Sequence, residues 1–204
     1  MKKVILSLVL STIFISAQAQ YEPGDIDISL GTGFGFYGAK TNDSDVDTSG
    51  VNAAAGLLNL GVNYTIANNY SIGLNFERNG FLTDTTTAYG YTMNYKLNFQ
   101  YRFINGEKNA LGLQAGVGMS SLKFVDENST DYVKGNGLTY EFVLLFHHYF
   151  GERFGMFINA GYGNYSYKEL RDQDGDLWLS DDNSESKTFS LSGVNARIGI
   201  QFKI

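Results

Sequence analysis

Hydrophobic and polar residues alternate strictly over the fifteen positions from Tyr89 to Phe103. Every odd position is aromatic or apolar, and every even position is glycine or a polar residue. Because side chains alternate between the two faces of a strand, the pattern predicts one long β-strand with an apolar and a polar face. A strand that crosses a bilayer at a tilt needs about 9–11 residues, with aromatic residues at both ends of its apolar band. Tyr89 and Tyr101 lie near the two ends, so we expect the apolar face to contact lipid.

Seven further segments show the same two-residue period. Their apolar positions begin at Ile26, Leu58, Ile72, Leu111, Leu138, Met156 and Val194. The seven connections alternate between long and short, and the first and last are long. Polar stretches at 39–50, 78–88, 125–136 and 169–186 are the long ones, and turns at 67–69, 105–109 and 151–153 are the short ones. Phe189 and Leu191 are out of phase with the final segment, which predicts a β-bulge near Ser192 and Gly193.

This pattern predicts an all-β fold, a transmembrane up-and-down antiparallel eight-stranded β-barrel. Bacterial outer-membrane barrels have an even number of strands, short periplasmic turns and longer extracellular loops. A chain whose first and last connections are long therefore has both termini in the periplasm. The alternative is a soluble barrel of the lipocalin kind, which would turn its apolar faces inward.

The first residues predict export. A short basic start at Met1–Lys3 precedes an apolar run over 4–15 and the sequence Ala17-Gln18-Ala19. This arrangement is typical of a secretory signal peptide, and the apolar run is shorter than the ~20 residues of a membrane-spanning helix. We expect residues 1–19 to be the signal peptide and residues 20–204 to be the outer-membrane barrel domain. No later apolar run has the length of a spanning helix, so a membrane span would have to be a closed barrel.

Composition narrows the function. The chain has no cysteine, so a small disulfide-stapled secreted scaffold is disfavoured. Of its 15 basic residues, two lie in the expected signal peptide, which leaves 13 basic against 21 acidic residues in the mature protein. This acidic balance disfavours nucleic acid as a partner.

The whole expected mature chain resembles the small bacterial outer-membrane barrels of the OmpA/OmpX type, often grouped as porin-family outer-membrane β-barrel proteins. The resemblance rests on the signal peptide, the eight strands and the amphipathic C-terminal segment 197–204. In that family the last strand is the recognition signal for the barrel-assembly machinery and usually ends in an aromatic residue. Ile204 departs from that pattern, although Phe202 keeps the apolar phase. The resemblance implies outer-membrane lipid and the assembly machinery as partners, and a location in the bacterial outer membrane.

Charged residues collect on the face expected to point inward. The predicted lumen charge network consists of Asp27, Glu77, Lys96, Arg102, Glu141, Arg197 and Lys203. They could be selectivity charges of a pore or a packed ion-pair network; eight strands leave an interior just wide enough for side chains, which favours packing. Since lone buried charges need partners, we expect Lys96 and Arg197 to face Glu141 and Glu77. We also expect Asp27 to lie near Lys203, where the first and last strands meet.

Other candidate sites are weaker. Asp172, Asp174 and Asp176 resemble the start of a calcium loop, but Leu177 and Asn183 stand where an EF-hand has Gly and Glu, so no metal is assigned. Leu177, Trp178 and Leu179 form an apolar group within the acidic stretch and are the candidate contact for an extracellular partner of unknown identity.

The histidines do not suggest catalysis. His147 and His148 are adjacent, so a strand turns them to opposite faces, and the His-x-Ser motif of lipid A deacylating barrels is absent. We therefore predict no catalytic residues and no cofactor.

Three functions compete on the sequence. The first is a structural or surface-interaction barrel that presents long acidic extracellular loops. The second is a narrow porin-like conduit for small solutes, and the third is an outer-membrane lipid-modifying enzyme. The first fits every feature and requires no catalytic site.

Overall fold

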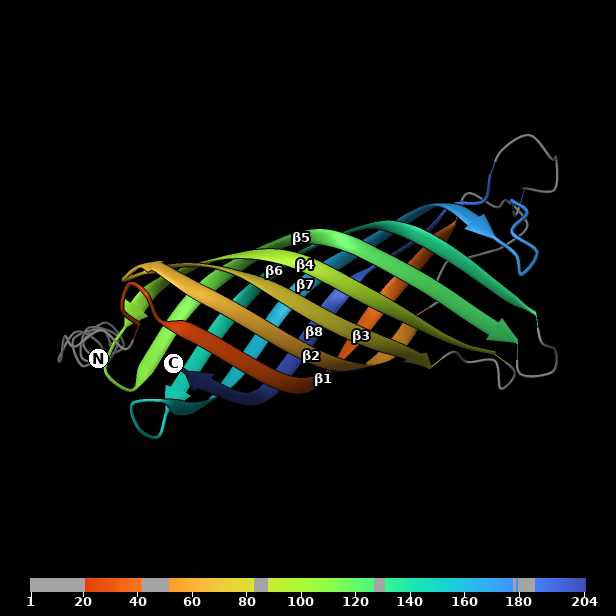
Figure 1. The fold of residues 1–204 in the computed structure, drawn as a ribbon. Coiled ribbons are helices and arrows are strands. Elements are labelled where there is room, and N and C mark those ends of the chain that lie inside the picture. The colour runs from red at the N-terminus through yellow and green to blue at the C-terminus, as the bar shows by residue number, and fades with distance from the viewer. Residues whose placement is uncertain (1–20, 42–51, 83–87, 127–130, 178, 180–185) are drawn as a thin grey trace, which may run out of the picture.

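The computed structural model describes residues 21–41, 52–82, 88–126, 131–177, 179 and 186–204. Eight strands form one sheet: β1 (Ile26–Thr41), β2 (Asn52–Ala67), β3 (Tyr70–Leu82), β4 (Ala88–Asn105), β5 (Asn109–Asp126), β6 (Tyr132–Tyr149), β7 (Phe154–Arg171) and β8 (Phe189–Lys203). Each strand pairs antiparallel with the next along the chain, and β1 pairs with β8 to close the barrel (Figure 1). The predicted all-β, up-and-down antiparallel eight-stranded barrel is confirmed. The expected signal peptide, residues 1–19, lies outside the described residues.

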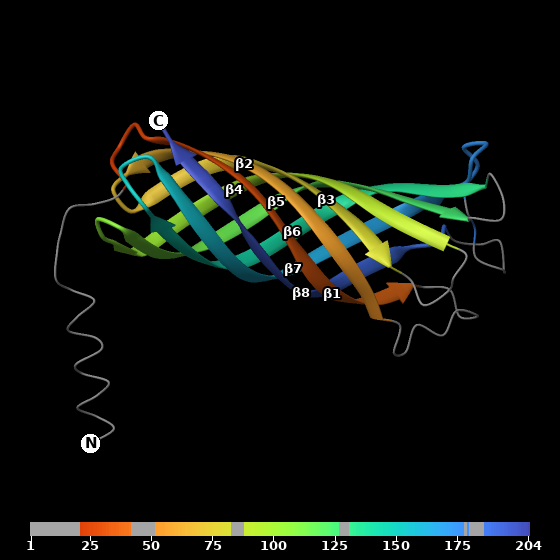
Figure 2. The same ribbon diagram turned by 90° about the horizontal axis from the view of Figure 1, so that it is seen from below.

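The two ends of the barrel differ. The connections 68–69, 106–108 and 150–153 lie at one end, here called the short-turn end, together with the start of β1 and the C-terminus (Figures 1 and 2). The opposite end, which carries the other four connections, is called the long-loop end. Several strands run further toward it than the sequence predicts, since Arg78–Leu82 belongs to β3 and β6 begins at Tyr132. Polar side chains do not end a β-strand as long as its backbone N–H and C=O groups remain hydrogen-bonded to the neighbouring strands.

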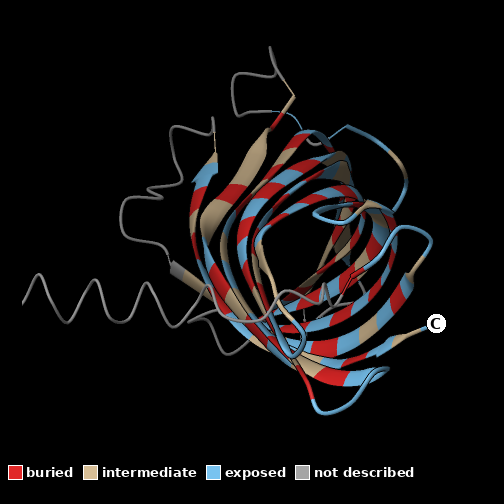
Figure 3. Cartoon of the chain, turned by 90° about the vertical axis from the view of Figure 1, so that its left-hand side faces the viewer, coloured by how far each residue is buried: buried red, intermediate tan, exposed pale blue. Residues whose placement is uncertain are grey.

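The outer wall is apolar over its middle. On β4, Tyr95, Leu97 and Phe99 expose 62%, 58% and 47% of their surface, whereas Lys96 and Asn98 between them are buried. The same alternation of buried and exposed positions follows the wall around (Figure 3). A continuous belt of exposed large apolar residues is the surface that hydrocarbon covers. The alternative of a soluble barrel, with these side chains in a central core, is therefore excluded.

The inner wall is not polar throughout. Toward the long-loop end, buried apolar side chains form a cluster here called the apolar mouth: Tyr37, Ala39, Ala55, Leu57, Phe81, Leu122, Tyr165, Tyr167, Leu170 and Leu191. The bulge predicted near Ser192 and Gly193 is wrong, because β8 keeps an unbroken register with both β1 and β7 through these positions. Leu191 is out of phase with the outward apolar residues because it points into the mouth, where it is 1% exposed, and Phe189 packs against the same cluster.

Within the described residues, no helix is long and apolar enough to cross a membrane.

Candidate functional site in the barrel lumen

Four charged side chains from four strands meet in the middle of the lumen. Lys96 of β4 donates to Glu141 of β6 at 2.6 Å and to Glu77 of β3 at 3.3 Å. Arg197 of β8 donates to Glu77 at 2.5 Å and to Glu141 at 2.8 Å. Each cation thus touches both carboxylates, and the two positive and two negative charges balance. All four side chains are buried, so each needs the others to offset its loss of hydration. We call this group the four-charge cluster.

Neutral polar groups extend the four-charge cluster toward the walls. Gln114 donates to the second oxygen of Glu141 at 3.0 Å. The Tyr165 hydroxyl donates to Glu77 at 3.3 Å, and Asn59 donates to the other oxygen of Glu77 at 3.4 Å. The carboxylates therefore accept several hydrogen bonds each, which is the condition under which buried charge is tolerated.

A second cluster, here called the short-turn plug, closes the barrel near the short-turn end. Its members are Tyr21, Asp27, Arg102, His147 and Tyr149, all buried. The Arg102 guanidinium carbon lies 3.4 Å from the centre of the Tyr21 ring, a cation–π contact. The Tyr21 hydroxyl is hydrogen-bonded to Nδ1 of His147, and the Tyr149 hydroxyl lies 2.9 Å from both the Tyr21 hydroxyl and Oδ2 of Asp27.

Sequence reasoning assigned no site role to Tyr21 or Tyr149, and Tyr21 lies outside every predicted strand. It precedes β1 and reaches across to β4, where its backbone N–H donates to Oδ1 of Asn105 at 3.1 Å and its carbonyl accepts from the same amide at 3.0 Å. No strand period includes residue 21. The only available signal was an aromatic residue just after the expected cleavage site.

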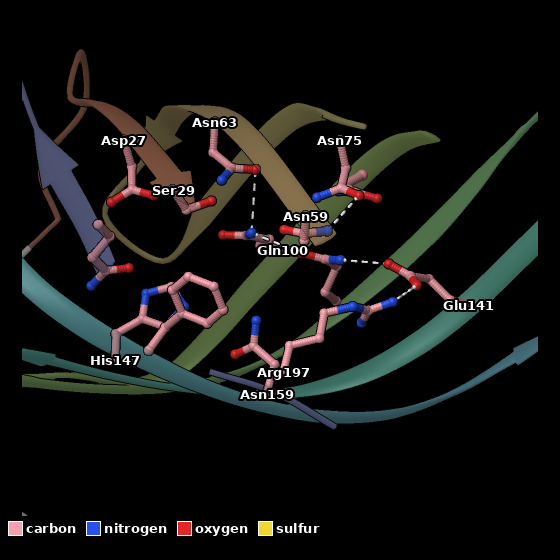
Figure 4. A pocket seen from close by; sticks show the side chains of 14 residues that line it. Asp27, Ser29, Asn59, Asn63, Asn75, Gln100, Glu141, His147, Asn159 and Arg197 are labelled. Atoms are coloured by element: carbon pink, nitrogen blue, oxygen red, sulfur yellow. Dashed lines mark hydrogen bonds and ion pairs between the residues drawn. The ribbon is translucent and has the colours of Figure 1, made fainter. Parts of the chain in front are cut away.

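A small polar cavity lies between the four-charge cluster and the short-turn plug. Figure 4 shows Asp27, Gln100 and His147 on one side of it and Arg197 extending toward Glu141 on the other. Its volume is about 20 Å³, which holds about one water molecule. The described lumen therefore has no room here for a solute.

The Phe157 ring narrows the lumen at this level. It lies across Gly31 and Gly199, which face each other in the β1–β8 register. A Cβ at Gly31 would lie 2.5 Å from the ring and one at Gly199 would lie 2.6 Å from it. A side chain at Gly31 would therefore meet the ring first, whereas one at Gly199 would also meet the carbonyl oxygen of Leu30.

The seven residues predicted as one lumen network fall into three places. Glu77, Lys96, Glu141 and Arg197 form the four-charge cluster, and Asp27 and Arg102 belong to the short-turn plug. Lys203 lies opposite Asp27 in the β1–β8 register, and its ammonium pairs with Asp25 at 3.3 Å. That ion pair sits at the barrel rim, outside the central cluster.

The candidates at the long-loop end are partly described. Leu177 and Leu179 expose 41% and 37% of their surface, and Trp178 lies outside the described residues. Oδ1 of Asp172 accepts the backbone N–H groups of Asp174, Gly175 and Asp176, each at 3.0 Å. That carboxylate therefore holds a turn. Across the described ranges, no group of three or more His, Cys, Asp or Glu side chains is arranged to hold a metal ion.

The two histidines lie on opposite faces of β6, as predicted. His147 is bonded to the Tyr21 hydroxyl, whereas Nδ1 of His148 is 2.7 Å from Oδ1 of Asn109 on β5. Within the described residues, no hydrogen bond joins either imidazole to a carboxylate or a serine. Neither histidine has the partners of a general-base relay.

Known proteins resemble the chain in structure. No family model and no curated protein sequence matches it. OprG of Pseudomonas aeruginosa, an outer membrane protein, superposes with a TM-score of 0.56 at 16% identity, over 92% of this chain and 99% of that one. The chain has the fold of the small outer-membrane β-barrels.

Two further outer membrane proteins superpose over most of their lengths. AlkL, solved in lipid bilayers, gives a TM-score of 0.51 at 15% identity over 94% of this chain and 95% of that one. The protease OmpT of Escherichia coli gives 0.50 at 11% identity over 89% and 97%. Identities this low establish the architecture and leave the activity to be argued from the side chains.

Proposed function

We propose that the protein is a closed barrel of the bacterial outer membrane that acts through its surface and has no catalytic activity. The role is structural or surface-interacting, exerted by the acidic connections at the long-loop end and by the outer wall. In this proposal the long-loop end faces the exterior and both termini lie in the periplasm. The observation that carries it is the four-charge cluster, which fills the middle of the lumen.

A closed lumen follows from the contacts along it. A solute entering from the long-loop end would first pass the apolar mouth, whose mostly aromatic and aliphatic side chains replace little of an ion's hydration. It would then have to separate Lys96 and Arg197 from both carboxylates, which leaves buried charges unpaired. The short-turn plug would still lie ahead. The narrow-conduit function requires all three barriers to open together.

The enzyme alternative lacks a site in the described residues. His147 contacts a tyrosine and His148 an asparagine, and the acidic groups nearest the lumen centre are neutralised by Lys96 and Arg197. Non-catalytic action at the surface is therefore the function that the described geometry supports best.

Single-channel recording tests the closed lumen. The mature chain, refolded and inserted into a planar bilayer, is expected to show no steady conductance. Lys96→Ala/Glu141→Ala, which removes one opposite-charge pair from the centre, is expected to show at most brief openings, because the short-turn plug remains. The matched control is Glu107→Ala/Lys108→Ala in an exposed turn. A large steady conductance of the unmodified protein would overturn the proposal.

Cysteine labelling tests the orientation, since the chain contains no cysteine. Gln173→Cys lies at the long-loop end and Lys108→Cys at the short-turn end, and both positions are exposed. In intact cells a membrane-impermeant maleimide is expected to label Gln173→Cys, and to label Lys108→Cys only after the outer membrane is permeabilised. The reverse pattern would refute the assignment of the two ends.

We further infer that the barrel-assembly machinery recognises β8. Phe202 and Ile204 are exposed on the outer wall at 45% and 65%, and β8 is the strand that closes on β1. Phe202→Ala is expected to lower the amount of barrel assembled in cells while leaving refolding of the purified chain unchanged. An equal loss in both settings would indicate a role in packing rather than in recognition.

A further inference from the structure

A groove of about 550 Å³ lies on the wall across β4 to β7, near the long-loop end. Four of the side chains that line it are cations: Lys123 of β5, Lys134 of β6, and Lys168 and Arg171 of β7. This concentration of positive charge stands out on a chain whose formal net charge is −6. We call this feature the basic groove.

Strand register places like charges side by side in the basic groove. Lys123 is directly opposite Lys134, and Lys134 is directly opposite Arg171. Like charges in such positions destabilise a sheet unless something between them compensates. Glu169, the carboxylate in the lining, pairs with Arg171 at 3.3 Å. In the described part of the chain, no ion pair joins Lys123, Lys134 or Lys168 to a carboxylate, so the groove keeps a positive excess.

Local structure turns these cations outward. The β6–β7 register shifts at Asn136, which pairs with Glu169, while the next residue pairs with Tyr167. Lys168 is the extra residue of this bulge, so Lys168 and Glu169 are both exposed instead of alternating. On the other side of the basic groove the Lys123 ammonium lies 4.0 Å from the centre of the Tyr132 ring, which holds that charge at the wall.

The basic groove lies at the height of lipid headgroups. On β5 the exposed large apolar residues end at Met119, which is 65% exposed, and Lys123 follows four residues later. Four residues of a tilted strand rise about 10 Å along the barrel axis. That distance places Lys123 just beyond the hydrocarbon, in the interfacial layer of the leaflet at the long-loop end. Of the other lining residues on β4, Tyr91 is directly opposite Lys123, and Met93 lies two residues nearer the middle of the wall.

We propose that the basic groove binds the phosphorylated headgroup of a lipid in the outer leaflet. The three lysines offer point charges for phosphate oxygens. Arg171, whose terminal nitrogens donate to the Gly175 carbonyl and to Glu169, adds positive charge beside them. Tyr91 beside the cations and Met93 below them suit the start of an acyl chain. A bound phosphate would lie between Lys123 and Lys134 and relieve their repulsion. The choice of leaflet rests on the proposed function, which places the long-loop end outside.

Binding is measured with the mature full chain, refolded in a zwitterionic detergent. The probes are diphosphorylated lipid A and the same lipid after enzymatic removal of its phosphates, detected as retained adducts by native mass spectrometry and as a rise in melting temperature. Lys123→Gln/Lys134→Gln is expected to weaken binding of the phosphorylated lipid about tenfold. The matched control, Lys108→Gln/Arg153→Gln, removes two exposed charges at the short-turn end and is expected to bind as the unmodified protein does.

Several results would overturn the headgroup site. These are equal binding of the dephosphorylated lipid, unchanged binding by Lys123→Gln/Lys134→Gln, or binding of inorganic phosphate or a sulfated oligosaccharide without binding of the lipid. Should the double variant fail to refold, Lys168→Gln, whose side chain extends from the bulge, replaces it and is expected to weaken binding by a smaller factor. The detergent assay does not depend on which way the barrel faces. Its failure would therefore leave the closed lumen intact, and a reversed orientation in cells would change only the leaflet.

Discussion

Removing one carboxylate from the four-charge cluster is expected to be costly. In Glu141→Gln, Lys96 and Arg197 share the single carboxylate of Glu77, and one positive charge is left buried without a partner. Glu141 also loses charge-assisted hydrogen bonds from Lys96 at 2.6 Å and Arg197 at 2.8 Å. Breaking a buried pair in this way costs about 3–5 kcal/mol. For a chain of this size the cost corresponds to a fall of about 6–20 °C in melting temperature.

The pairing is isolated by a double-mutant cycle. Lys96→Met/Glu141→Gln removes one charge of each sign and leaves Arg197 paired with Glu77 at 2.5 Å. The loss of stability in the double variant is therefore expected to be smaller, by about 1–3 kcal/mol, than the sum of the losses in the two single variants. Urea unfolding of the barrel in lipid vesicles, followed by circular dichroism and by heat-modifiable gel mobility, gives the four free energies. Glu107→Gln, in an exposed turn, is the control and is expected to change stability by less than about 0.5 kcal/mol. Additive single effects, or a Glu141→Gln variant as stable as the control, would refute the reasoning.

Three further changes probe the short-turn plug, the lipid face and the narrowed lumen. Tyr21→Ala removes the ring over Arg102 and is expected to lower the free energy of unfolding in vesicles by about 2 kcal/mol. Tyr21→Phe keeps the ring and should lower the free energy of unfolding by less. Equal losses of stability in the two variants would contradict a cation–π role. Leu97→Arg puts a charge in the middle of the exposed apolar face and is expected to cost about 2–4 kcal/mol in vesicles, with Leu97→Met as the neutral control. Gly31→Ala puts a Cβ 2.5 Å from the Phe157 ring and is expected to lower refolding yield. Phe157→Ala should relieve most of that loss, and no relief would mean that the Ile198 carbonyl oxygen, at 2.9 Å, is the obstacle instead of the ring.

The two-residue period predicted the fold because each strand separates its faces so cleanly. The alternation on β4 indicated both the outward apolar face and the inward position of Lys96, and the need of buried charges for partners indicated Glu77 and Glu141. The ion pairs join side chains from four different strands, so they cannot be deduced from the pattern of any one strand. The prediction of these pairs depended on the narrowness of an eight-stranded barrel, which brings every inward side chain near the axis.

The remaining features could not be predicted because they depend on position along the barrel axis. The pattern treats an inward residue as polar, so Leu191 looked out of phase, although it packs in an apolar mouth formed by other strands. Tyr21 lies outside every periodic segment, and its contacts are to β4 and β6. The basic groove was missed for a similar reason: Lys123, Lys134 and Arg171 are far apart in sequence and become neighbours only through register.

The position of Tyr21 constrains the order of events during folding. This residue precedes the first strand, yet its bonds are to Asn105 at the end of β4 and to His147 and Tyr149 on β6. Those sites exist together only once most of the barrel wall has assembled, because the partners of Tyr21 lie 84 to 128 residues further along the chain. Docking of Tyr21 is therefore a late step of folding. A segment fused directly before Tyr21 would have to leave the barrel between the short turns before Tyr21 could dock.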